Sequence, residues 1–144
     1  MTVPTITVDF DDTLYTKAFV EIARKRLSFF KTLINSGIFR VVVVTARKDN
    51  IHEIVEFCDN NDIRIDGIVH NAGNKLNILK ELNTVAHFED SDSITPLLAE
   101  NGINVFYMGE YTSQNCKTTW KDSLVEQGIW HYYVLDNNTR GLDE

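Results

Sequence analysis

"FRVVVVT", residues 39–45, decides the fold of this 144-residue chain. Its four consecutive valines show no alternation of polar and apolar residues, which indicates a strand that is buried on both faces. Such strands are typical of parallel sheets that are covered by helices on each side. The segment therefore predicts an α/β protein, and the neighbouring segments support this.

Helical and strand-like patterns alternate along most of the chain. Apolar residues at helical spacing fall within residues 17–36, 51–58, 76–82 and 94–98. Gly37 follows the first of these stretches as a natural helix stop. Besides 39–45, short apolar runs predict strands at 5–10, 65–70, 84–88 and 103–108. The alternation predicts a three-layer α/β/α sandwich around a mostly parallel, Rossmann-like sheet.

The pattern is weaker after Met108. Residues 118–128 suggest a helix, and "IWHYYVL" at 129–135 predicts a further strand at the sheet edge. We expect a single domain over 1–144, with a core at about 3–108 and a C-terminal extension at about 109–144.

Composition and charge narrow the functional classes. The net charge of −7 argues against broad nucleic-acid binding, which relies on basic surface. No apolar run approaches the length of a membrane span, and the N-terminus lacks the pattern of a signal peptide. We therefore expect a cytoplasmic protein that binds no membrane. Cys58 and Cys116 share no motif and are expected to be reduced.

Acidic side chains follow two of the predicted strands. Asp9, Asp11 and Asp12 stand in "VDFDDTL" (8–14) after the first strand, and "HFEDSD" (87–92) ends another. Ligands of open parallel sheets bind at the carboxyl ends of the strands, so these acids should converge there. Two carboxylates from one strand and one from another form an oxygen cage suited to Mg²⁺. The ion would offset their repulsion and attract a phosphate, and a carboxylate could then attack phosphorus.

At these residues the sequence resembles the haloacid dehalogenase-like (HAD) superfamily. "DFDDTL" is similar to its DxDx[T/V] signature, and "VVVVT" to its second motif, an apolar strand ending in Ser or Thr. Lys75 takes the place of the third motif, and "HFEDSD" that of the acidic fourth. The motifs occur in the family's order over residues 5 to about 107. The resemblance implies a HAD-like fold.

The resemblance also implies a role for each matching residue. Asp9 would be the nucleophile, and Asp11 the general acid that later activates water. Thr45 would donate a hydrogen bond to the phosphoryl group, and Lys75 would neutralise its charge. An Asp at position 11 points to phosphate-ester hydrolysis or phosphoryl transfer rather than dehalogenation. Ala46 and Arg47, with Lys48 beyond them, follow Thr45 and are further candidates for binding the substrate phosphate.

The implied metal ligands are Asp9, Asp11 and Asp90, with Asp11 acting through its backbone carbonyl. The family's fourth motif usually reads Asp-Asp or Gly-Asp, whereas this chain has Glu89-Asp90. Glu89 is therefore an alternative ligand to Asp90. Asp12 is expected either to lie in the loop or to support the metal ligands from outside.

The resemblance implies a Mg²⁺-dependent phosphatase that hydrolyses a phosphate monoester through an aspartyl-phosphate. There is no room for a cap domain after "DDTL" or before "NAGNK". Uncapped members resemble enzymes that act on large substrates, such as phosphorylated proteins or nucleic-acid ends, or that borrow a neighbouring subunit as a lid. The substrate could therefore be a nucleotide, a nucleic-acid end or another phosphate ester, and a homo-oligomer is possible. The alternative is a non-enzymatic regulatory module that binds metal or phosphate. A receiver domain does not fit, because no acid ends the strand at 65–70.

Other residues have simpler structural interpretations. Asp92 is interpreted as a helix cap before Ile94, and Lys80 is the fallback for Lys75. The histidines, which show no metal-ligand spacing, are interpreted as structural: His52, His70, His87 and His131. The C-terminal aromatic residues could stack on bases, but packing or a dimer contact is the favoured interpretation: Trp120, Trp130, Tyr132 and Tyr133.

Overall fold

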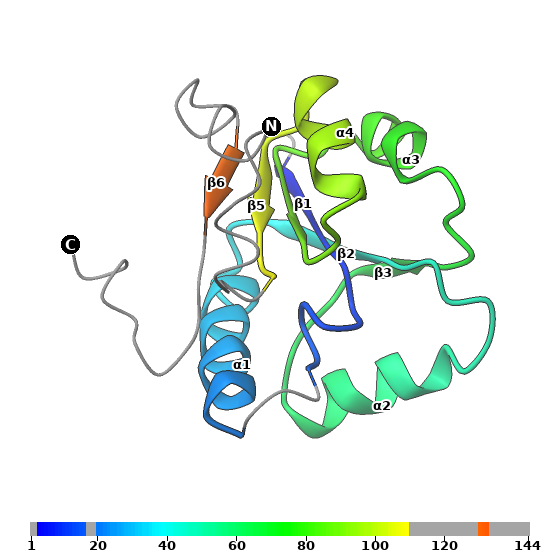
Figure 1. Ribbon diagram of the computed structural model, residues 1–144. Coiled ribbons are helices and arrows are strands. Elements are labelled where there is room, and N and C mark those ends of the chain that lie inside the picture. Colours follow the sequence, from blue (N-terminus) through cyan, green and yellow to red (C-terminus); the bar gives the residue numbers. More distant parts are fainter. Residues whose placement is uncertain (1–2, 17–19, 110–129, 133–144) are drawn as a thin grey trace.

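A computed structural model describes residues 3–16, 20–109 and 130–132. In these ranges the strands form one parallel sheet in the order β3-β2-β1-β4-β5-β6 (Figure 1). The strands are β1 (Thr5–Val8), β2 (Arg40–Val44), β3 (Gly67–Val69), β4 (Ala86–Glu89), β5 (Val105–Tyr107) and β6 (Trp130–Tyr132). The helices are α1 (Val20–Ile34), α2 (His52–Asn60), α3 (Lys75–Leu82) and α4 (Ile94–Glu100). The predicted alternation and parallel sheet are confirmed.

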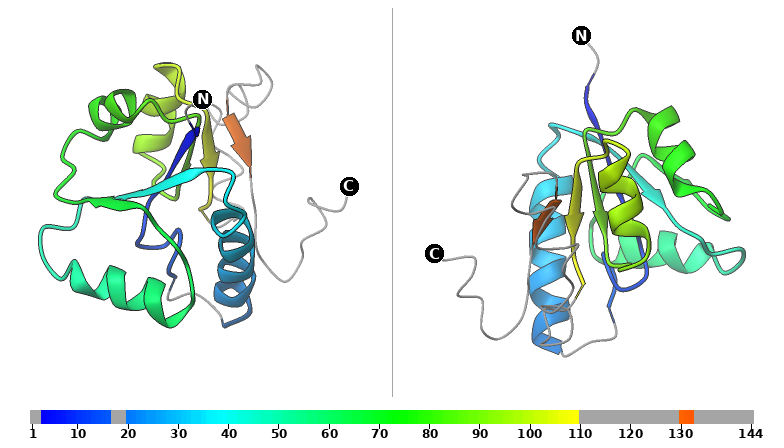
Figure 2. Two further views of the ribbon diagram at one scale, coloured as in Figure 1. Left: turned by 180° about the vertical axis from the view of Figure 1, so that it is seen from behind. Right: turned by 45° about the horizontal axis from the view of Figure 1, so that its top comes forward.

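Helices cover both faces of the sheet. In Figure 1, α1 and α2 lie below the sheet and α3 and α4 above it, and Figure 2 shows the same layers from two other directions. β2 illustrates why both faces are closed. Val41 and Val43 pack into the core under α1 and α2, whereas Val42 and Val44 pack into the core under α3 and α4. The run of valines that predicts a doubly buried strand is buried along its whole length.

The structure shortens several predicted elements. β1 ends at Val8 rather than Phe10, because the chain turns there and the Phe10 carbonyl accepts hydrogen bonds from Thr13 N–H (3.2 Å) and Tyr15 N–H (3.0 Å). Gly37 follows α1 with a φ of +77°, as the predicted stop requires. β6 confirms a strand within 129–135, whereas the helix suggested at 118–128 falls outside the described residues. No helix in the described ranges is both long and apolar enough to span a membrane.

The strand order places the functional edge. From β1 the chain proceeds outward to β2 and β3, and then returns to place β4 on the other side of β1. The direction of winding therefore reverses between β1 and β4. In open parallel sheets, the crevice beyond the carboxyl ends of the strands at such a reversal is where ligands bind. Both acidic segments of the sequence begin here.

Cys58 offers a test of the packing of α2. It lies in the core with 2% of its surface exposed, and burial raises the pKa of its thiol to about 11. Because a thiol reacts as the thiolate, the ionised fraction at pH 8 is lower than that of an ordinary cysteine by about 100-fold.

We therefore expect Cys58 to resist alkylation by iodoacetamide at pH 8 by at least that factor until the protein unfolds. The measurement uses the Cys116→Ser variant, which leaves Cys58 as the one thiol of the chain. Labelling of the folded protein at the rate of its urea-unfolded form would contradict the burial of this helix face.

Candidate metal and active site

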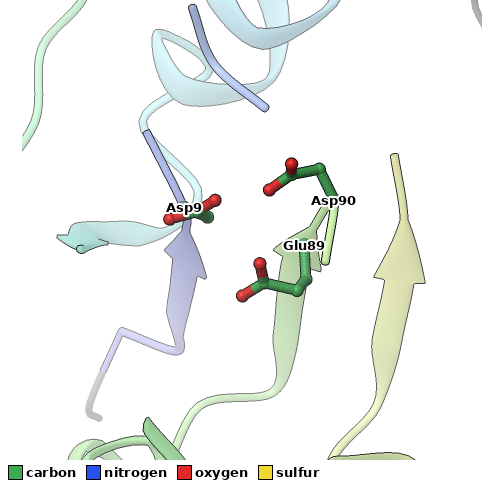
Figure 3. Close-up of side chains that lie close together, drawn as sticks. All are labelled: Asp9, Glu89 and Asp90. Carbon is green, nitrogen blue, oxygen red and sulfur yellow. The ribbon is translucent and has the colours of Figure 1, made fainter. Parts of the chain in front are cut away.

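Three carboxylates from two neighbouring strands meet at the reversal point. Asp9 follows β1, Glu89 ends β4, and Asp90 comes directly after it. Each offers an oxygen atom, and these oxygen atoms lie within 4.8 Å of one another. Figure 3 shows the three carboxylates gathered at the carboxyl ends of the two strands. The predicted convergence of acids on one edge is confirmed for these three.

Lys75 adds a positive charge to this acidic cluster. It is the first residue of α3, and its ammonium group lies 3.0 Å from Asp9 Oδ1 and 2.8 Å from Glu89 Oε1. Asn74 fixes this helix start, because its side chain accepts a hydrogen bond from Asn77 N–H (3.2 Å). The fallback, Lys80, is exposed near the other end of α3. The structure thus brings Lys75 to the acids and leaves Lys80 outside.

The charges of this cluster do not cancel. Three carboxylates and one ammonium group leave two negative charges when all are ionised (−3 + 1 = −2). Burial, with the nearby charge of Glu89, raises the pKa of Asp9 well above its ordinary value. Burial likewise raises the pKa of Asp90. A divalent cation ligated by oxygen would remove this excess, so the residues present fit Mg²⁺ or a similar hard ion.

Glu89 and Asp90 differ in how firmly they are already held. Burial alone would raise the pKa of Glu89, but the hydrogen bonds from His87 and Lys75, together with the positive charge of Lys75, more than offset it and lower that pKa to about 2. Both donors reach the same oxygen, Oε1. Asp90 is more exposed, and its Oδ1 accepts a hydrogen bond from Thr13 (3.2 Å). Asp90 is therefore better placed to turn toward an ion.

Thr13 is a member of the site that sequence reasoning missed. Its hydroxyl group is fully buried and lies 3.4 Å from Asp9 Oδ2 and 3.2 Å from Asp90 Oδ1. It follows the acids in "DFDDTL", where the bracketed position of the motif allows Thr. The hydroxyl links the carboxylates of two strands and limits their rotation.

Asp11 does not join the other carboxylates. Both of its oxygens pair with Arg47, from Nε (2.8 Å) and from Nη2 (2.8 Å), in a two-point ion pair. The Arg47 guanidinium also lies over the Phe10 ring, 5.2 Å from its centroid, and 3.6 Å from Glu53. Arg47, predicted to bind substrate, therefore has its carboxylate-binding edge filled by Asp11. A substrate phosphate would have to displace Asp11 from it.

The remaining predicted residues lie around this edge. Thr45 is buried at the end of β2, where its Oγ1 accepts a hydrogen bond from Arg47 N–H (3.1 Å), whereas Ala46 and Lys48 are exposed. The interpretation of Asp92 as the helix cap is wrong: Ser93 occupies the N-cap of α4. Asp92 instead accepts a hydrogen bond from the Tyr107 hydroxyl (2.5 Å). This bond ties the loop after β4 to β5.

His87 is the second residue whose place the sequence did not reveal. It is completely buried, with Nε2 2.9 Å from Glu89 Oε1 and Nδ1 2.8 Å from Thr7 Oγ1. Burial lowers the pKa of its ring, so we take it as neutral. The alternation within "HFE" contained a signal, because residues two apart on a strand face the same side and His87 must then lie beside Glu89.

Arg26 of α1 holds the loops on both sides of the cluster. It is buried, and its guanidinium group donates hydrogen bonds to the backbone carbonyls of Asp12 and Met108. Asp12 lies in the turn after β1, with a φ of +59°, and Met108 follows β5. One side chain thus connects two loops that flank the end of β4.

Comparisons with known proteins leave the family unassigned, since no protein-family model matches the chain and no curated protein matches it in sequence. In the absence of a family, the class of protein is given by the fold and the site alone. This is a Rossmann-like parallel α/β domain with a buried acidic group that could hold a metal ion.

Proposed function

We propose that this protein is a Mg²⁺-dependent phosphatase of the HAD type that hydrolyses a phosphate monoester. The observation that carries the proposal is the arrangement of Asp9, Asp90 and Lys75 at the point where the sheet reverses direction. A carboxylate nucleophile, an acidic metal-ligand pair and a cation for the phosphate are the parts that such a reaction requires. The sequence motifs supply the same residues in the same order.

The reaction would proceed in two displacements at phosphorus. Asp9 attacks the phosphate, the bond to the ester oxygen breaks, and Asp11 gives a proton to the leaving oxygen. Asp11 then accepts a proton from water, which attacks the aspartyl-phosphate, releases phosphate and restores Asp9. Lys75 holds Asp9 in place and attracts the phosphate. Thr45 would donate to a phosphoryl oxygen from the end of β2.

Asp9 and Asp90 would hold the ion, with the Asp11 backbone carbonyl as a further ligand and Glu89 as the alternative. When bound, Mg²⁺ would neutralise charge on the phosphate and keep Asp9 ionised. This second effect matters because burial raises the pKa of Asp9, and a protonated carboxyl group is a poor nucleophile.

The substrate is a phosphate ester whose identity the site leaves open. Only residues 70–74 separate β3 from α3, so no cap domain is inserted there. A nucleotide or the phosphorylated end of a nucleic acid fits this arrangement. The excess of acidic residues over the whole chain disfavours extended contact with a polynucleotide.

One observation favours the non-enzymatic alternative. The Asp11 carboxylate is held by Arg47, so the general acid of the mechanism is not directed at the cluster. A module that binds metal or phosphate without hydrolysis would have no need to release it. Hydrolysis requires this ion pair to open when substrate binds.

Removal of the metal tests the proposal. Release of phosphate from a panel of nucleotides, sugar phosphates, phosphopeptides and 3′- or 5′-phosphorylated oligonucleotides is measured with Mg²⁺ and with EDTA. We expect EDTA to reduce turnover of the preferred substrate by at least about 100-fold, and added Mg²⁺ to restore it, because the acidic cluster needs the cation. Turnover that persists in EDTA would contradict the metal role. Metal binding without hydrolysis of any substrate would favour the non-enzymatic module.

A further inference from the structure

A buried row of polar side chains runs from the acidic cluster into the sheet. Thr7 of β1 and His87 of β4 are register partners on adjacent parallel strands. Two residues further along each strand come Asp9 and Glu89, on the same face as Thr7 and His87. Polar groups on this face are buried beside the core of α3 and α4, so each needs a partner.

Two hydrogen bonds of this row lead from Thr7 through His87 to Glu89. Lys75 donates to Glu89 Oε1 and Ser91 N–H to Oε2, so both carboxylate oxygens are acceptors and His87 Nε2 carries the hydrogen of the 2.9 Å bond. His87 Nδ1 then accepts from the Thr7 hydroxyl at 2.8 Å. The Thr84 hydroxyl lies 3.0 Å from Thr7 Oγ1 and donates to the Ala86 carbonyl at 2.7 Å. This order fixes the orientation of the His87 ring from its far side.

The row determines what Glu89 can bind. Its Oε1 accepts from both Lys75 (2.8 Å) and His87, and its Oε2 accepts from Ser91 N–H (3.3 Å). A carboxylate with these contacts is oriented before an ion arrives. It lies close enough to Asp9 and Asp90 to become a ligand if it were released.

We propose that His87 is a positioning residue: its hydrogen bond keeps the Glu89 carboxylate paired with Lys75 and out of the coordination shell of the ion. With one carboxylate ligand fewer, the site binds Mg²⁺ in preference to Ca²⁺. The inference rests on the proposed metal site. Mg²⁺ binds through one or two carboxylates and retains several waters, whereas Ca²⁺ takes six to eight oxygens and benefits from another carboxylate. Outer partners of metal ligands commonly change affinity by about 10–100-fold.

Two substitutions of His87 separate positioning from packing. In His87→Gln the terminal amide can reach the position of Nε2 and still donate to Glu89. In His87→Asn the shorter amide occupies the position of Nδ1 and retains Thr7, but loses Glu89. Both variants place a polar group in the same buried space, so a purely structural role would affect them alike.

The experiment titrates the metal-free full chain with MgCl₂ and with CaCl₂ by calorimetry, and circular dichroism checks that each variant is folded. We expect the ratio of the Ca²⁺ Kd to the Mg²⁺ Kd to fall by at least about tenfold in His87→Asn and to stay within about threefold in His87→Gln. In a Glu89→Gln background, His87→Asn should cause no further change, because the effect passes through Glu89. Thr7→Val removes the hydrogen bond to His87 Nδ1, so it should also lower the ratio of the two Kd values, though by a smaller factor than His87→Asn. This variant serves as the test if His87→Asn does not fold.

The outcomes are distinct. An unchanged ratio in His87→Asn, or equal shifts in His87→Asn and His87→Gln, overturns the role of His87 and leaves the proposed phosphatase standing. A wild-type chain that binds neither ion overturns the metal site itself and this inference with it.

Discussion

Replacing Asp9 by Asn should reduce phosphate release by at least about 1000-fold while leaving the protein folded. The amide cannot attack phosphorus, and losses of this order accompany removal of a nucleophile. The amide oxygen can still accept a hydrogen bond from Lys75, which now contacts Asp9 Oδ1 at 3.0 Å. Removing one of the clustered negative charges should also leave the metal-free protein no less stable. Phosphate release and thermal unfolding measure the two effects.

Asp12→Asn is the matched control for this variant. Asp12 lies in the same turn but is exposed, and its φ of +59° suits Asn as well as Asp. Its turnover should stay within about twofold of wild type. Turnover retained in Asp9→Asn, or lost equally in both variants, would remove Asp9 as the nucleophile.

Replacing Lys75 by Met should lower the free energy of unfolding by about 3–5 kcal/mol at pH 7, the usual cost of breaking a buried ion pair. Met has a similar length but no charge, so Asp9 and Glu89 lose their common counter-ion in a buried place. Activity should fall as well. Urea unfolding measures the loss, and Lys80→Met on the exposed side of α3 should change stability by less than about 0.5 kcal/mol.

The loss in Lys75→Met should depend on pH. In the wild type, the pKa of Glu89 is lowered to about 2, so its stabilising contribution is present above its unfolded pKa and lost as pH falls toward 2. In the variant, burial without Lys75 raises the pKa of Glu89 and Asp9, and the folded state then gains stability as these groups take up protons. The difference between the two proteins should therefore narrow from pH 7 to pH 4. An equal difference at both values would show that Lys75 stabilises by packing rather than by charge.

The fold could be predicted because its signals are local. The valines of β2 are apolar without interruption, since the sheet covers both of their faces, and the same periodicity rules located each helix. The positions of the strand ends were predicted less accurately. Phe10 continues the alternation of apolar residues begun by Ile6 and Val8 far enough to resemble strand, but the turn after β1 uses the Phe10 carbonyl.

The site was only partly predictable for a different reason. Position along the sequence shows which residues reach the carboxyl edge, so Asp9, Lys75, Glu89 and Asp90 were identified. It does not show which partner a side chain chooses there. Asp11 pairs with Arg47 through a rotamer choice, and His87 meets Thr7 through the register of β1 and β4, neither of which a single sequence specifies.

Arg26 restricts the movement of two loops at the site before any ligand binds. Because one buried guanidinium group binds the backbone of both the Asp12 turn and Met108, a shift of either loop relative to α1 would break a buried hydrogen bond. The conformational entropy of these loops is thus lost when the chain folds rather than when a ligand arrives. A ligand that bound at this edge would therefore have less loop entropy to remove.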